Sequence, residues 1–81
     1  MHPRFLADLH FWVDEDPRKA SRILRLVAEI VRDPFHGTGK PEPLRGRTGM
    51  WSRRIDQEHR LTHLPAADHV EFLQARFHYH P

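Results

Sequence analysis

A stretch rich in glycine and proline, residues 34–49, divides this chain of 81 residues into two parts with different sequence patterns. It contains all four glycines together with Pro34, Pro41 and Pro43. Glycine and proline interrupt helices and strands, so the stretch predicts a constrained loop rather than a disordered linker. Apolar residues recur at helical spacing before the loop and in strand-like runs after it. The fold must therefore join a helical part to a strand part through one rigid connection.

The part before the loop predicts two helices. The first covers residues 3–13, with Pro3 in its first turn. The second begins after Asp16, a typical N-cap residue, has Pro17 in its first turn, and ends at Asp33-Pro34. The two form a short antiparallel hairpin. The apolar stripes expected to face the interior are Phe5, Leu9, Trp12 and Val13 in the first helix, and Ala20, Ile23, Leu24, Val27, Ile30 and Val31 in the second.

The part after the loop predicts three strands, at residues 50–56, 58–64 and 70–78, with a turn over residues 65–68. Two helices followed by consecutive strands predict an α+β domain, in which both helices pack on one face of a small antiparallel sheet. Eighty-one residues are enough for one small domain, so residues 1–81 are expected to form a single unit.

Charge and cysteine content narrow the classes of function. Residues 36–81 hold seven Lys and Arg against five Asp and Glu, and six of the eight histidines. This excess of positive charge suits a polyanionic partner. The absence of cysteine excludes a disulfide framework and a thiolate nucleophile or metal site. No apolar run approaches the roughly 18 residues that cross a bilayer, and the N-terminus does not resemble a signal peptide, so the expected location is the cytoplasm.

Side chains of a strand alternate between the two faces of a sheet, and this alternation groups the charged residues. Glu58 and Arg60 share one face of the second predicted strand, and Arg76 and His78 share one face of the last. If these faces coincide, the four side chains line the side of the sheet that the helices leave open. The loop that carries Glu42 could then fold over this surface, which is the candidate site.

Three motifs bring the charged residues together: GTGKPEPLR at residues 37–45, WSRRIDQEHRL at 51–61 and RFHY at 76–79. They supply carboxylates, an imidazole and several guanidiniums, which suffice to cleave RNA without a metal. In such a reaction Glu42, held between two prolines, would take the proton of the 2′-hydroxyl, and His78 would protonate the leaving oxygen. Arg60 would contact the scissile phosphate with its planar fork.

These motifs, in this order and spacing, resemble the Txe/YoeB family of bacterial toxins, which have the RelE-like superfold. The resemblance implies the toxin of a type II toxin–antitoxin system, a ribosome-dependent endoribonuclease that cuts mRNA in the ribosomal A site without a metal or other cofactor. It also implies an antitoxin of the YefM or Axe type that holds the enzyme inactive. The residues that it implies are catalytic are Glu42, Arg60 and His78; those for binding substrate or ribosome are Lys40, Arg45, Arg54 and Tyr79, with Glu58 and Arg76 in supporting roles.

One departure from the family concerns the N-terminus. Family members usually begin with an apolar strand, whereas only Met1 and His2 precede Pro3 in this sequence. The first strand is therefore expected to be truncated or missing. An unpaired sheet edge is a place where another chain can add a strand, so we expect an antitoxin segment or a second copy, in a homodimer, to bind there.

Other interpretations remain open at this point. The chain could be a catalytically weak or inactive module that binds ribosome or antitoxin, or a metal-dependent nuclease that uses His78 and His80. Glu42 and Arg54 could be ordinary solvated charges. His59 and His63 share the face of Leu61, which favours a structural role for both. Trp51 and Tyr79 could stack on bases or simply pack.

Overall fold

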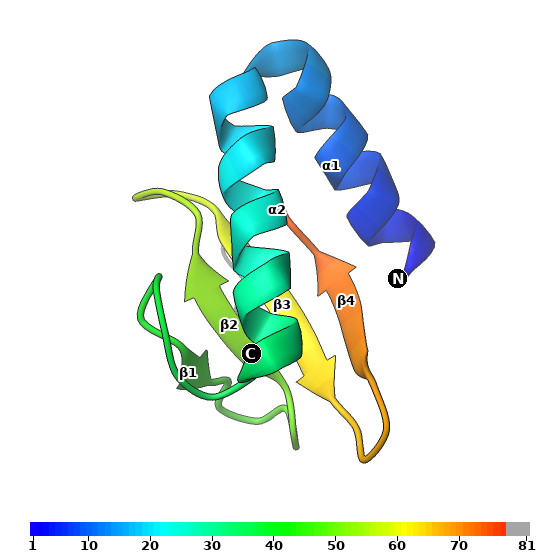
Figure 1. The fold of residues 1–81 in the computed structure, drawn as a ribbon, viewed down its shortest axis with the longest axis vertical. Coiled ribbons are helices and arrows are strands. Elements are labelled where there is room, and N and C mark those ends of the chain that lie inside the picture. The colour runs from blue at the N-terminus through cyan, green and yellow to red at the C-terminus, as the bar shows by residue number, and fades with distance from the viewer. Residues whose placement is uncertain (78–81) are drawn as a thin grey trace.

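A computed structural model describes residues 1–77 and shows two helices packed against one face of a four-stranded sheet (Figure 1). The sheet order is β1-β2-β3-β4, and every neighbouring pair is antiparallel. This arrangement confirms the predicted α+β fold class. The elements are α1 (Pro3–Glu15), α2 (Pro17–Arg32), β1 (Glu42–Pro43), β2 (Trp51–Arg54), β3 (Arg60–Pro65) and β4 (Val70–Gln74).

Capping residues set the helix starts. The side chain of His2 accepts a hydrogen bond from the Arg4 N–H, and that of Asp16 accepts one from the Arg18 N–H. Helix α1 runs to Glu15, beyond the predicted residue 13, because the Asp16 N–H still donates to the Trp12 carbonyl. Helix α2 ends next to Asp33-Pro34, as predicted. Within residues 1–77, no helix is long and apolar enough to cross a membrane.

The core lies between the helices and the sheet, and it corrects part of the predicted stripes. Val13, Leu24 and Val31 are 49%, 51% and 64% exposed, so their predicted burial was wrong. The buried stripe of α2 includes Leu26 instead. The face of the helix that points to the core is therefore turned away from Leu24 and Val31. The buried apolar residues are Phe5, Trp12, Ala20, Ile23, Leu26, Ile30, Ile55, Leu61, Phe72 and Ala75.

The sheet contains the three predicted strands in shorter form and one strand that was not predicted. Glu42 and Pro43 form β1, which pairs with β2 at the edge of the sheet, although these residues were expected in a loop. An edge strand tolerates proline because one side of it needs no backbone donor. No strand precedes α1 in the described part of the chain, and the His2 N–H donates to the Phe72 carbonyl at 2.8 Å.

Strand β4 ends at Gln74, four residues before the predicted end, because α1 takes both backbone groups of Ala75. The Ala75 N–H donates to Asp8 Oδ2 at 2.9 Å, and the Ala75 carbonyl accepts a hydrogen bond from Trp12 Nε1 at 2.8 Å. All three residues are buried. Sequence alternation was expected to place Arg76 on one face of the last strand. Because β4 ends at Gln74, this expectation does not hold for Arg76.

Replacing Asp8 with Ala should lower the free energy of unfolding by about 1–3 kcal/mol, because it leaves the buried Ala75 N–H without an acceptor. Urea unfolding measures this change. Asp14→Ala is the matched control, since Asp14 lies exposed on the same helix. Equal midpoints for the two variants would contradict the role of Asp8.

Candidate functional site

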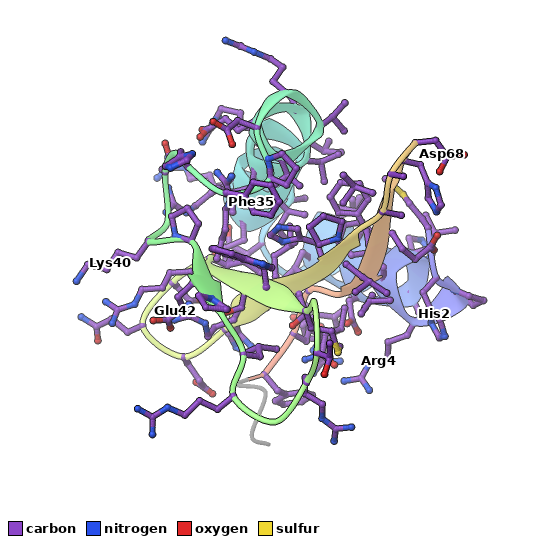
Figure 2. The ribbon with its side chains drawn as sticks, turned by 90° about the horizontal axis from the view of Figure 1, so that it is seen from below. His2, Arg4, Phe35, Lys40, Glu42 and Asp68 are labelled. Carbon is purple, nitrogen blue, oxygen red and sulfur yellow. The ribbon has the colours of Figure 1, made fainter. Side chains whose placement is uncertain are left out.

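Glu42 and Arg60 lie together on the open side of the sheet. Arg60 Nη2 is 3.0 Å from Glu42 Oε1, although the two residues are eighteen positions apart in the sequence. Glu42 pairs with Ser52 in the β1–β2 register, and Arg60 pairs with Arg54 in the β2–β3 register. Figure 2 shows Glu42 on the side of the sheet away from α2. The structure thus brings together two of the three residues predicted to be catalytic.

The two members of this pair differ in exposure. The side chain of Glu42 is 60% exposed, and that of Arg60 only 5%. Arg60 Nε donates to Ser52 Oγ at 2.9 Å, whereas Nη2 makes the ion-pair contact with Glu42 without an aligned hydrogen bond. Burial is the main reason that the pKa of Arg60 lies below its usual value; Glu42 opposes this shift, and Arg54 adds to it. Nη2 of Arg60 is therefore a buried donor that is not committed to another aligned hydrogen bond.

The cations predicted to bind substrate or ribosome lie at the surface around this pair. Lys40, Arg45 and Arg54 are exposed, and none of the three forms an ion pair within residues 1–77. Figure 2 shows Lys40 pointing away from the body of the protein. Arg54 lies opposite Arg60 in the β2–β3 register, so two positive charges share one side of the sheet. Such a surface favours a ligand with negative charge.

The two residues predicted to support the site lie elsewhere than expected. Glu58 belongs to the turn before β3 and not to the strand, because Asp56 accepts hydrogen bonds from the backbone N–H groups of Glu58 and His59. Its carboxylate is 75% exposed and lies 3.9 Å from His59 Nε2, so Glu58 does not share a strand face with Arg60 as predicted. The guanidinium of Arg76 stacks on the ring of Phe11, 3.5 Å from its centroid.

His78 and Tyr79 lie outside the described residues, as does His80. The chain just before them is held against the strand that carries Arg60. The Phe77 N–H donates to His59 Nδ1 at 2.8 Å, and the Phe77 carbonyl accepts a hydrogen bond from the Arg60 N–H at 3.1 Å. The ring of His59 also packs edge-on against Trp12. These contacts support the structural role predicted for His59.

Ser52 and Arg53 were not predicted to have a role, yet both are completely buried, as is His63. Ser52 could have been found from its sequence position, since it shares the face of Arg54 within WSRRI. The burial of Arg53 could not have been predicted from the sequence, because arginine is a hydrophilic residue. His63 was predicted to be structural, and its Nε2 indeed lies 3.0 Å from the Pro34 carbonyl.

Comparisons with known proteins agree on one family. The model of the family described as "YoeB-like toxin of bacterial type II toxin-antitoxin system" matches residues 1–79. The toxin RelK of Mycobacterium tuberculosis is 56% identical over 73 residues, which cover 89% of this chain and 86% of that protein. Two Staphylococcus aureus structures superimpose closely: a YoeB dimer (TM-score 0.87, 33% identity) and a YoeB–YefM complex (TM-score 0.84, 32% identity), each covering 95% of this chain and 91% of the matched one.

The stability of the protein should fall as the pH drops below about 6.5, the ordinary pKa of histidine, in part because of His63. Burial lowers the pKa of His63, and the positive charge of Arg53 acts in the same direction, while the hydrogen bond to the Pro34 carbonyl opposes them. The unfolded chain then binds a proton that the folded chain excludes, so the contribution of His63 is complete above that pH and is lost below it.

His63→Gln keeps an N–H donor and cannot titrate, so it should flatten the dependence of unfolding free energy on pH. Urea unfolding at pH 7.5 and 5.5 measures the change, with His10→Gln, an exposed residue, as control. An identical pH dependence in wild type and His63→Gln would contradict the interpretation.

Proposed function

Because the chain belongs to the family of YoeB-like toxins of bacterial type II toxin–antitoxin systems, we propose that it is a metal-independent endoribonuclease that cuts mRNA on the ribosome. One observation carries this proposal: a solvent-accessible carboxylate, Glu42, lies 3.0 Å from the buried guanidinium of Arg60. When a 2′-hydroxyl attacks the adjacent phosphodiester, a base must take its proton and a cation must stabilise the charge on the phosphate. Glu42 and Arg60 can serve these two needs.

In the proposed reaction the RNA supplies the nucleophile. Glu42 takes the proton of the 2′-hydroxyl, and the 2′-oxygen forms a bond to phosphorus as the bond from phosphorus to the 5′-oxygen breaks. His78 donates a proton to that leaving oxygen. The products are a 5′-hydroxyl end and a 2′,3′-cyclic phosphate, or the 3′-phosphate that its hydrolysis yields.

Arg60 would hold the non-bridging oxygens of the phosphate, with Arg54 assisting from the neighbouring strand. The buried side chain of Arg60 is fixed by Ser52, so little reorganisation is needed as charge develops on the phosphate. The low exposure of Arg60 also strengthens its interaction with an anion, because water screens it less.

The partners follow from the same family. An antitoxin of the YefM type is proposed to hold this protein inactive, supported by the similarity to the Staphylococcus aureus YoeB–YefM complex. The similarity to the YoeB dimer supports self-association as well. Lys40, Arg45 and Arg54 are exposed, and we propose that they dock on ribosomal RNA, with Tyr79 contacting the mRNA. Contacts with phosphates make such binding strongly dependent on salt.

Glu42→Gln should lower the rate of mRNA cleavage on saturating ribosomes by about 10²- to 10⁴-fold, the usual contribution of a general base. Ribosome affinity should change little. Glu15→Gln, an exposed residue at the end of α1, is the matched control and should cleave normally. If Glu42→Gln instead loses ribosome affinity and keeps its turnover, Glu42 is a docking residue.

His78→Gln should abolish cleavage of ribosome-bound mRNA, and a chelator should leave the wild-type rate unchanged, because His78 would donate a proton and no metal takes part. The assay compares both proteins with and without EDTA. Loss of wild-type cleavage in EDTA would favour a nuclease that uses metal at His78 and His80. No cleavage by the wild type would favour a binding module without catalysis.

A further inference from the structure

The side chain of Arg53 is completely buried, and its terminal nitrogens bond to one loop and to the helix before it. Nη2 donates to the carbonyls of Asp33 and His36, at 2.7 and 2.8 Å. Nη1 lies 3.3 Å from both the Thr38 carbonyl and Glu29 Oε1. Burying a guanidinium is costly unless its donors find partners, so these contacts fix the loop and the side chain to each other.

His63 adds a fourth loop carbonyl to this set. Its Nε2 lies 3.0 Å from the Pro34 carbonyl, and a carbonyl can only accept, so Nε2 carries the proton. Arg53 and His63 project from β2 and β3 toward the same face of the sheet. We call the two side chains and the carbonyls of residues 33, 34, 36 and 38 the loop clamp.

The sequence of the loop is adapted to this clamp. A Cβ on Gly37 would lie 2.8 Å from Arg53 Nη1 and 2.6 Å from Glu29 Oε1, and its φ of +129° is a conformation that other residues rarely adopt. Two residues later, the Gly39 carbonyl accepts a hydrogen bond from the Arg54 N–H at 2.7 Å. The guanidinium therefore occupies space that a side chain at position 37 would need.

The clamp ends at the Thr38 carbonyl, four residues before Glu42. Between Gly39 and Glu42 the chain has only Lys40 and Pro41, and proline fixes its own φ. Strand β1 is two residues long, and just beyond it the Leu44 N–H donates to the Met50 carbonyl at 2.9 Å. Pairing with β2 therefore holds Glu42 from one side, and the clamp holds the chain on the other. The position of Glu42 next to Arg60 thus depends in part on where the clamp fixes residues 33–38.

We propose that Arg53 is a positioning residue for the reaction: it fixes the loop that places the Glu42 carboxylate against Arg60 and the substrate. This inference rests on the proposed role of Glu42. Arg53 itself faces away from the site, since it lies on the opposite face of β2 from Ser52. Lysine cannot replace it, because a single ammonium lacks the planar fork that bonds to several carbonyls in fixed directions.

The first test measures hydrogen exchange of the free protein by NMR, for wild type, Arg53→Lys and Arg53→Met. The Arg54 amide, which is bonded to the Gly39 carbonyl, should exchange about 10-fold faster or more in both variants, because the loop opens without unfolding the domain. The Ile55 amide, which lies just after β2 and is bonded to the His59 carbonyl, should keep its rate. Equal acceleration at both amides, or none at Arg54, would overturn the clamp.

The second test is a double-mutant cycle for mRNA cleavage on saturating ribosomes. Arg53→Met should lower kcat by about 10²-fold, the effect of a small misplacement of a catalytic group, and leave KM unchanged. In a Glu42→Gln background the same substitution should have almost no further effect. Arg25→Met, an exposed arginine on α2, is the matched control. If Arg53→Met lowers kcat by the same factor in the wild-type and Glu42→Gln backgrounds, Arg53 acts independently of Glu42 and the proposal is refuted.

The two tests separate the inference from the function on which it rests. If Glu42→Gln cleaves at the normal rate, the proposed role of Glu42 fails, and the catalytic role of Arg53 fails with it. The amide exchange rates of the free protein still show whether Arg53 holds the loop, because that measurement does not depend on enzymatic activity. If Glu42→Gln is inactive but Arg53→Met cleaves normally, the proposed function stands and the positioning role of Arg53 is refuted.

Discussion

The alternation of side chains along β2 and β3 is the constraint on which both the core and the site depend. Arg60 and Leu61 are neighbours in sequence, yet Leu61 packs under the helices while Arg60 bonds to Ser52 on the other face. Packing of Leu61 therefore determines which way Arg60 points. A shift of one residue in the β2–β3 register would exchange the two faces, burying Arg60 in the core and exposing Leu61. The hydrophobic core and the charged surface are thus specified by the same pairing.

The same sheet buries one arginine on each face, and their partners give them different uses. Arg53 directs its terminal nitrogens to backbone carbonyls and Glu29, so it has a fixed structural surrounding. Arg60 has Ser52 and an exposed carboxylate as partners. Each arginine leaves one buried nitrogen without an aligned hydrogen bond, Nη2 in Arg60 and Nε in Arg53, but only Arg60 has its free nitrogen beside an exposed carboxylate. A cation that is held in place and incompletely paired can accept a new anionic partner at little cost in reorganisation. The contrast lies in the partners, since both side chains are almost fully buried.

Local signals in the sequence were sufficient for much of this fold. The Asp16-Pro17 and Asp33-Pro34 pairs mark α2 correctly because capping and proline geometry act within a few residues. Arg53 and Arg54 lie on opposite faces of β2, as the alternation of side chains along a strand requires. Other features depend on contacts between distant segments. Strand β4 stops where side chains of α1 bond to Ala75, and Glu42 lies in a strand only because β2 is beside it. Neither could be inferred from neighbouring residues.

The contacts of Asp8 and Trp12 with Ala75 also bear on how the chain folds during its synthesis. The Trp12–Ala75 hydrogen bond joins residues 63 positions apart, whereas the sheet is a meander of neighbouring strands that can form locally. Closing so long a loop costs entropy that only the finished contact offsets. Helix α1 therefore cannot dock until β4 has left the ribosomal exit tunnel. Until then, α1 lacks the segment whose Ala75 bonds to Asp8 and Trp12.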